Sequence, residues 1–273
     1  MRPIIICAVV SLQVAGITAL ASEAQRSDEG AKLLGKLQNA LGGAKQIAAI
    51  RDFEEVISAE AWDSKGESLG RVRKRTRWMR SPNVVRLDQL GYRGTYVLFF
   101  DGATGAGWEI PPDVAGTDPF RTDGKPVPLK DGELTFAKGY LSGFVLNQWL
   151  ADRTPGYTVS SPRANVLRIA HDGDVTDFTL DPATGLPLKS AGVSLAAPDR
   201  PVPAEIRYSG WKPFSDVRFP SRRVNYHSGV KRGEVVTETI HINGGLNAGV
   251  LGTKPTDFAP DIPRPATASR RFP

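Results

Sequence analysis

The chain has 273 residues and a formal net charge of +6, from 35 basic and 29 acidic side chains. This mild excess of base is far from the composition of a nucleic-acid-binding protein, and a single cysteine excludes a disulfide scaffold or a cysteine-ligated metal centre. The high counts of glycine (28) and proline (21) indicate many turns and favour a β-rich protein, in one large domain or two small ones.

The first 21 residues have the pattern of a secretory signal peptide. Arg2 precedes a short apolar run, and Ala19-Leu20-Ala21 supplies a small-x-small cleavage motif. We therefore expect residues 1–21 to be removed, a mature start at Ser22 or Gln25, and a periplasmic protein without a membrane span after cleavage. Cys7 lies too early to be a lipidated cysteine. An uncleaved anchor is the alternative.

Helical spacing dominates the start of the predicted mature chain. Leucines and an alanine recur at this spacing, at positions 33, 34, 37, 40 and 41, after the N-cap candidate Ser27. Gly42-Gly43 predicts the end of this helix. A second short helix is expected over Ala44–Ile50.

From Asp52 the pattern changes to short strands separated by turn residues. We expect an antiparallel meander of strands at 53–62, 71–79, 84–89, 95–101 and 107–110. Pro111–Asp131 is predicted to be a long loop, and an amphipathic helix is expected over 133–151. Strands then resume at 165–170, 175–180, 188–195, 204–208, 218–227 and 234–242. The proline-rich end, 259–273, is predicted to be a disordered tail.

The sequence contains no recognisable catalytic constellation. Gly139–Gly143 resembles a nucleophile elbow, but its serine, Ser142, comes one place late. The three histidines lie far apart and have no partner at metal-ligand spacing. We therefore predict no enzyme activity, no cofactor and no metal. A hydrolase with an unrecognised site remains an alternative, because catalytic groups can meet from distant loops.

The predicted second strand carries arginines at alternate positions, which places them on one face. Either this face meets lipid headgroups or an acidic partner, or it is a solvated outer face whose arginines pair with acids such as Glu54 and Glu60. The second interpretation is preferred. The arginines are Arg71, Arg73, Arg75 and Arg77.

Several short motifs resemble the LolA/LolB-like family of periplasmic lipoprotein carriers and its uncharacterised relatives. They lie, in chain order, at Leu41–Ala44, Arg77–Arg86, Val97–Gly102 with Trp108, Asp181–Pro187, Val217–Pro220 and Ile240–Phe258. The resemblance implies a mainly β protein with helices, in which an incomplete antiparallel β-barrel wraps round the helices and shields acyl chains in an apolar cavity. It also implies a single domain over residues 22–258.

The predicted function is the binding of a lipid, a lipoprotein acyl chain or another apolar ligand in the cell envelope, with an envelope protein as a possible partner. The inserted helix is the expected cover of the cavity, and Arg77 or Arg86 would supply polar specificity at its mouth. The expected lining is aromatic and aliphatic: Trp62, Trp78, Leu98, Phe100, Trp108, Phe144 and Trp149. A scaffold or sensor module with a filled core is the main alternative.

Overall fold

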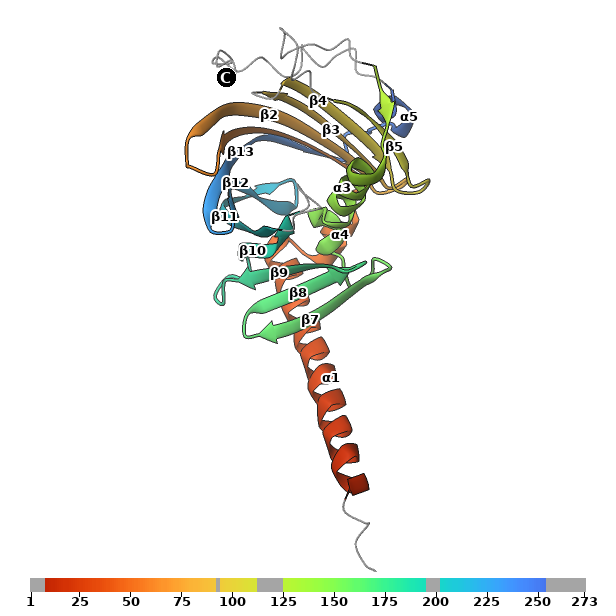
Figure 1. Ribbon diagram of the computed structural model, residues 1–273, viewed down its shortest axis with the longest axis vertical. Helices are drawn as coiled ribbons and strands as arrows, with labels where there is room; N and C mark the ends of the chain where they lie inside the picture. The colour runs from red at the N-terminus through yellow and green to blue at the C-terminus, as the bar shows by residue number, and fades with distance from the viewer. Residues whose placement is uncertain (1–7, 92–93, 112–124, 195–201, 254–273) are drawn as a thin grey trace, which may run out of the picture.

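A single curved antiparallel sheet organises the protein (Figure 1). The computed structural model describes residues 8–91, 94–111, 125–194 and 202–253. In this part of the chain 13 strands follow the order β6-β5-β4-β3-β2-β1-β13-β12-β11-β10-β9-β8-β7. Strands far apart in the sequence therefore meet in the middle of the sheet, where Phe53 of β1 pairs with Ile242 of β13. β6 and β7 lie at opposite edges, so the sheet is not closed, and the predicted incomplete antiparallel barrel is confirmed.

The first half of the sheet is one meander. Its strands are β1 (Asp52–Trp62), β2 (Ser68–Met79), β3 (Val84–Gly91), β4 (Gly94–Asp101), β5 (Ala106–Ile110) and β6 (Val127–Pro128).

The second half is another meander, which returns to the first through β13. Its strands are β7 (Tyr157–Arg163), β8 (Val166–His171), β9 (Asp174–Leu180), β10 (Pro187–Ser194), β11 (Val202–Phe214), β12 (Val217–His227) and β13 (Val230–Ile242). The predicted switch from strands to a helical segment and back to strands is confirmed.

Helix α1 (Ala8–Leu41) packs its C-terminal part against β7 and β8 and projects away from the sheet at its start (Figure 1). The predicted leucine stripe faces the core, and Leu37 and Leu41 are fully buried. Gly30 allows close contact with β7, because a Cβ atom there would lie 2.4 Å from the Cα of Ser160. No helix among the described residues is both long and apolar enough to cross a membrane. Cleavage within this segment stays a prediction.

The predicted pair of glycines ends α1. The Gly43 N–H donates to the Gln38 carbonyl over 2.8 Å, and both Gly42 and Gly43 have positive φ, which glycine adopts without strain. The short helix α2 (Ala44–Ala48) follows.

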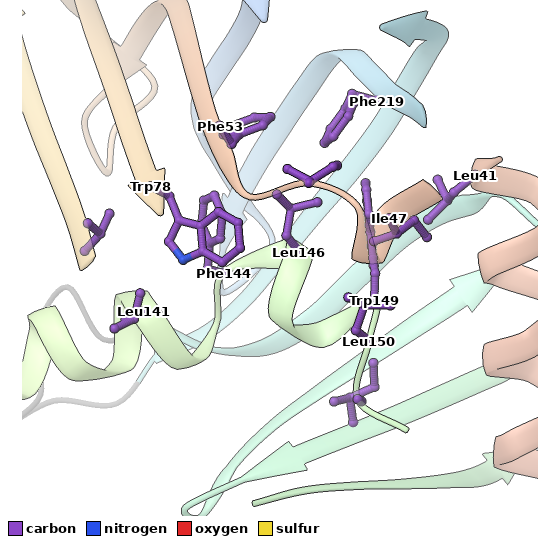
Figure 2. Close-up of a cluster of buried hydrophobic side chains, with 14 of the residues drawn as sticks. Leu41, Ile47, Phe53, Trp78, Leu141, Phe144, Leu146, Trp149, Leu150 and Phe219 are labelled. Atoms are coloured by element: carbon purple, nitrogen blue, oxygen red, sulfur yellow. The ribbon is translucent and has the colours of Figure 1, made fainter. Parts of the chain in front are cut away.

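The inserted helical segment is two helices, so the prediction of one helix over 133–151 is corrected. Helix α3 (Asp131–Ser142) ends at Gly143, Phe144 is extended, and α4 (Val145–Gln148) follows. The break turns the Phe144 side chain toward Trp78, and the two ring centroids lie 5.1 Å apart (Figure 2). Both helices lie on the concave side of the sheet (Figure 1).

Other predicted boundaries also need correction. β7 was not predicted, because its sequence is polar and contains Pro162, which only an edge strand tolerates well. β11 is longer than predicted, and its register with β12 is the same on both sides of Gly210, which has a positive φ. The predicted loop after Ile110 contains β6 and the start of α3, while residues 112–124 and the predicted tail lie outside the described residues.

The main core lies between the concave face of the sheet and the helices (Figure 2). Aromatic side chains from β1, β2 and β12 and from the two residues that flank α4 meet there. Phe53 lies 5.3 Å from Phe219, and Trp149 lies 5.3 Å from the same ring. This aromatic contact joins the two halves of the sheet through their inner faces.

Candidate ligand-binding site

A cavity of about 370 Å³ lies on the concave side of the second half of the sheet, under α3 and α4. This volume falls within the range of small-molecule sites, which is roughly 300–1,000 Å³. Its described lining is mostly apolar and comes from β1, β2, β9–β12 and the α3–α4 segment. The main apolar side chains are Phe53, Phe144, Val145, Trp149, Phe178, Ile206, Trp211 and Phe219.

Small residues leave this space open. On the sheet side, Gly192 of β10 pairs directly with Ala204 of β11, so two neighbouring positions carry almost no side chain. On the helix side, Gly139 and Gly143 line the same cavity. Val193, at the rim, keeps 59% of its surface exposed. The cavity is therefore open toward solvent at an apolar rim.

A second hollow of about 280 Å³ adjoins the first and shares Gln148 and Thr176 with it. The Gln148 side-chain amide donates to the Thr176 hydroxyl over 3.0 Å, so one hydrogen bond lies between the two spaces. Tyr157 and His171 line the second hollow, with ring centroids 4.3 Å apart.

One charged pair lies in the wall of the larger cavity. Arg223 of β12 donates from Nη2 to Glu55 Oε1 over 2.7 Å, and the Thr237 hydroxyl of β13 donates to the same oxygen over 2.8 Å. Glu55 is 8% exposed. The register puts Arg223 directly opposite Tyr208 of β11. The side chains of Glu55, Arg223, Thr237 and Tyr208, from β1, β12, β13 and β11, thus form one polar spot.

A pair of hydroxyl groups completes this polar spot. Tyr208 OH and Ser190 Oγ lie 2.7 Å apart. Burial raises the pKa of Tyr208, although Ser190 and the positive charge of Arg223 act in the opposite direction. The phenol therefore stays protonated at neutral pH and can donate a hydrogen bond.

Of the predicted lining, Phe144 and Trp149 lie at this cavity. Trp78, Leu98 and Phe100 are almost fully buried on the same concave side, but in the filled core under the first half of the sheet. The proposed ligand contact of these residues stays a prediction, and the geometry favours it for Phe144 and Trp149.

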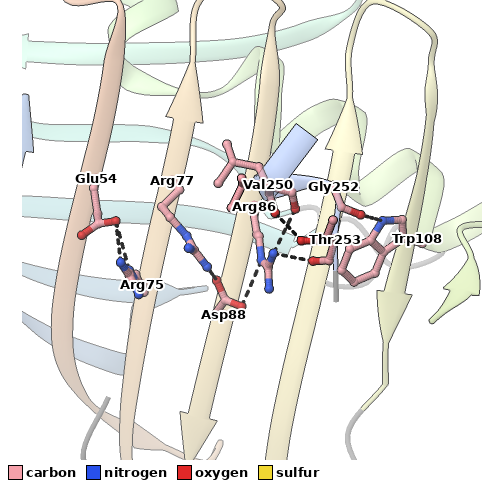
Figure 3. Close-up of polar contacts among 10 residues, drawn as sticks. Glu54, Arg75, Arg77, Arg86, Asp88, Trp108, Val250, Gly252 and Thr253 are labelled. Carbon is pink, nitrogen blue, oxygen red and sulfur yellow. Dashed lines mark hydrogen bonds and ion pairs between the residues drawn. The ribbon is translucent and has the colours of Figure 1, made fainter. Parts of the chain in front are cut away.

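Arg77, Arg86 and Trp108 lie on the opposite, outer face of the sheet (Figure 3). Arg77 and Arg86 both pair with the buried carboxylate of Asp88; the Arg86 Nε atom lies 3.1 Å from it. They therefore line no part of the described cavity, which corrects the expected position of the two arginines at its mouth. The physical reason is the strand register. Arg77, Arg86 and Trp108 lie in one row across β2, β3 and β5 on the outer face, whereas Trp78 and Phe100 lie in a row on the concave face.

The C-terminal segment covers this outer face. Arg86 Nη1 donates to the carbonyls of Leu251 and Thr253 over 3.0 and 2.6 Å, and Trp108 Nε1 donates to the Gly252 carbonyl over 3.0 Å (Figure 3). Leu251, in the short helix α5 (Ala248–Leu251), is 1% exposed. The first half of the sheet is thus covered on both faces.

The remaining predicted positions lie away from the cavity. Trp62 is at the far end of β1, where the Lys231 ammonium group lies 4.0 Å from its ring centroid. In the arginine strand, Arg75 pairs with Glu54 over 2.9 Å, as the preferred interpretation predicted. Arg73 pairs with Glu238, whereas Glu60 accepts a hydrogen bond from Ser68.

The polar residues of the cavity were not predicted from the sequence. Arg223 and Tyr208 lie in strands without a distinctive motif, and Glu55 was considered only as part of a Glu54-Glu55 pair pointing to opposite faces. That opposite orientation is correct, because Glu54 pairs with Arg75 on the outer face and Glu55 lines the cavity. The alternation of side chains along β1 was therefore the sequence signal that could have placed Glu55 on the inner face.

The structure gives little support to a serine hydrolase. Ser142 lines the second hollow with His171, but its hydroxyl donates to the Gly139 carbonyl of its own helix over 3.1 Å. Within the described ranges, no cluster of three histidine, cysteine or acidic side chains could hold a metal ion.

No protein-family model matches this sequence, and no curated protein matches it. Solved structures do resemble it. A DUF1329 family protein from Desulfovibrio piger has a TM-score of 0.51 and 10% identity, covering 83% of this chain and 97% of its own. This likeness shows a shared fold.

Two further structures are similar at lower TM-scores. A putative outer membrane lipoprotein-sorting protein domain from Vibrio parahaemolyticus has a TM-score of 0.46 and 11% identity, covering 84% of this chain and 98% of its own. A LolA superfamily protein from Nitrosomonas europaea has a TM-score of 0.48 and 10% identity, covering 82% and 97%. The open antiparallel sheet with helices on its concave side is thus a fold that this chain shares with the DUF1329 family structure.

Proposed function

We propose that this protein is a binding protein for an apolar, chain-like ligand such as a lipid or the acyl chain of a lipoprotein. The observation that carries the proposal is the apolar cavity between α3–α4 and β9–β12. Each methylene group transferred into such a site contributes about 0.8 kcal/mol. A preformed cavity with an exposed apolar rim suits this mode of binding.

The α3–α4 segment is the proposed cover. Gly143 separates the two helices, and Phe144 extends between them against the core. Three described hydrogen bonds tie it to the wall: Gln148 bonds to Thr176, the Tyr157 hydroxyl donates to the Ser142 carbonyl over 2.5 Å, and the Lys74 ammonium group donates to the Tyr140 hydroxyl over 3.4 Å. A segment held mainly by apolar contacts can shift to admit a chain without leaving many buried polar groups unpaired.

Export to the periplasm is part of the proposal, and it rests on the pattern of residues 1–21. Binding in the cell envelope would suit an acyl chain that must cross an aqueous compartment between two membranes. No catalytic residue is proposed.

A scaffold with a filled core is the second candidate. It is favoured by the first half of the sheet, where Trp78 and Leu98 are fully buried and leave little space. The two candidates predict different behaviour toward aliphatic ligands, because a filled core has no site for them.

Quenching of tryptophan fluorescence by 12-bromododecanol tests the proposed function. Trp149 and Trp211 both line the cavity, so a bound bromoalkyl chain should quench them saturably, with unbrominated dodecanol as the competitor. Native mass spectrometry of protein purified from the cells that make it should show a bound lipid. Linear, non-saturable quenching and a ligand-free mass would together favour the scaffold.

A further inference from the structure

The polar side chains in the cavity wall determine which kind of head group an apolar ligand can carry. Glu55 and Arg223 are the charged side chains among the described residues that line the cavity. Their charges cancel at a separation of 2.7 Å. The cavity wall is therefore apolar with one charge-balanced, hydrogen-bonding spot.

Unused hydrogen-bonding capacity remains at this spot. Within the described chain Arg223 is bonded through Nη2, to Glu55 and at 3.5 Å to Thr237, which leaves the N–H groups at Nε and Nη1. Its side chain keeps 24% of its surface exposed. The hydroxyls of Tyr208 and Ser190 form one hydrogen bond with each other, which leaves one O–H group free to donate and oxygen lone pairs free to accept.

A second carboxylate fits this spot poorly. The single positive charge is already paired, so an incoming anion would add an uncompensated negative charge next to Glu55 in a mostly apolar wall. An ester carbonyl has no such cost, because it accepts hydrogen bonds from the remaining guanidinium N–H groups, and a neighbouring hydroxyl can bond to Tyr208 or Ser190.

We propose that the Glu55–Arg223 pair makes the cavity selective for an aliphatic chain with a neutral, ester-bearing head over the same chain with a free carboxylate, and that Glu55 is the residue that determines this specificity. This inference rests on the proposed function. It assigns Glu55 the role of excluding an anion rather than that of contacting the chain.

Isothermal titration calorimetry with two ligands of equal chain length tests the inference at pH 8. The wild-type protein should bind monododecanoylglycerol at least about tenfold more tightly than dodecanoate, since juxtaposed like charges cost several kcal/mol. Equal or tighter binding of dodecanoate would overturn the inference but leave the proposed function intact. If neither ligand binds, and dodecanol does not bind either, the proposed function itself fails.

The isosteric variant Glu55→Gln gives the sharper measurement. Its amide oxygen can still accept from Arg223 and Thr237, while Arg223 now carries an unbalanced positive charge. The preference for the ester should fall by at least about tenfold, mainly through tighter binding of dodecanoate. An unchanged ratio in a folded variant would refute the role of Glu55. Should the variant fail to fold, the wild-type ratio still decides.

The matched control is Glu54→Gln, at the adjacent position on the outer face, where Glu54 pairs with Arg75. This variant should keep the wild-type ratio. Two sources of an ester-bearing chain exist, a free acylglycerol and an acylated protein. Competition by an S-acylglyceryl-cysteine peptide supports the acylated protein as the source, and its failure supports the free acylglycerol; both outcomes support selection of the ester.

Discussion

The two halves of the sheet have the same meander topology but different interiors. Under β2–β5 the concave side is filled by Trp78, Leu98 and Phe100, and the outer side is sealed by the C-terminal segment. Under β9–β12 the concave side encloses a cavity. The difference arises from side-chain size at paired positions: Trp78 faces Val85 across the β2–β3 pair, whereas Ala204 faces Gly192 across β10–β11.

We infer that the first half of the sheet is rigid and that the second half holds the proposed binding site. Tight packing on both faces fixes the first half, since interiors at crystal-like density do not deform easily. The second half can respond to a ligand because its strands are largely half-exposed, as the burial of β11 illustrates.

Replacing Trp78 by Ala should cause the largest loss of stability. The side chain is fully buried, contacts Phe144 and donates its indole N–H to Asn83 over 3.1 Å, so its removal should lower the free energy of unfolding by about 3–5 kcal/mol. Urea denaturation followed by circular dichroism measures this change. Trp211→Ala, in the wall of the cavity, is the comparison and should cost clearly less. Equal losses would show that the second half is packed as tightly as the first.

Asp88→Asn should be the next most damaging change. It removes the charge that both Arg77 and Arg86 pair with in a buried site, and breaking such a pair costs about 3 kcal/mol or more. The matched variant Asp177→Asn breaks a pair with the half-exposed Arg168 and should cost less than about 1 kcal/mol. Thermal melts of both variants give the comparison; similar shifts in Tm would contradict the claim that the outer face is sealed.

Ala204→Phe should affect binding more than stability. The added ring projects into the cavity opposite Gly192, so we expect at least about tenfold weaker binding of dodecanol with a change in unfolding free energy of less than about 1.5 kcal/mol. Ser209→Phe adds the same ring at an exposed position of β11 and should bind as the wild type does. A large loss of stability in Ala204→Phe alone would mean that the cavity is not available space.

Glu109→Gln should have the smallest effect, and one that depends on pH. Burial raises the pKa of Glu109, the negative charge of Glu133 raises it further, and a hydrogen bond from Tyr96 opposes both. The native state therefore holds this proton more tightly than the unfolded state, and stability is lost as pH rises through the raised pKa. The variant should match the wild type at pH 4 and be more stable at pH 8, by less than about 1 kcal/mol because the group is half-exposed. Urea midpoints at both pH values provide the measurement, and a variant that is less stable at pH 8 would contradict this account.

Much of the fold was predictable, because alternation and turn residues are local properties of the sequence. The meander from Phe53 to Ile110 follows from such signals, and so does the glycine pair after Leu41. β7 was not predictable in the same way, because its seven residues include polar side chains and Pro162. It is stabilised instead by tertiary contact with α1.

The cavity was not predictable, because it depends on which positions face one another across strands. Parity alone shows that Arg77 and Trp78 point to opposite faces, but not which face is concave. The register places Trp108 on the face of Arg86 and Phe100 on the face of Trp78, so the predicted lining combined residues of both faces. Gly192 and Ala204 carry no signal until their pairing is known.

The pairing of β1 with β13 in the middle of the sheet has a consequence for synthesis of the chain. β1 is made early, yet its partner on this side is β13, the last described strand of the sheet, so this edge of β1 stays unpaired until β13 has been made. Contacts so distant in sequence slow folding, and an open strand edge is a site of aggregation. Folding of this protein should therefore finish only after β13 has been synthesised, and a chain truncated before Val230 should be recovered as aggregate rather than as a half-sheet.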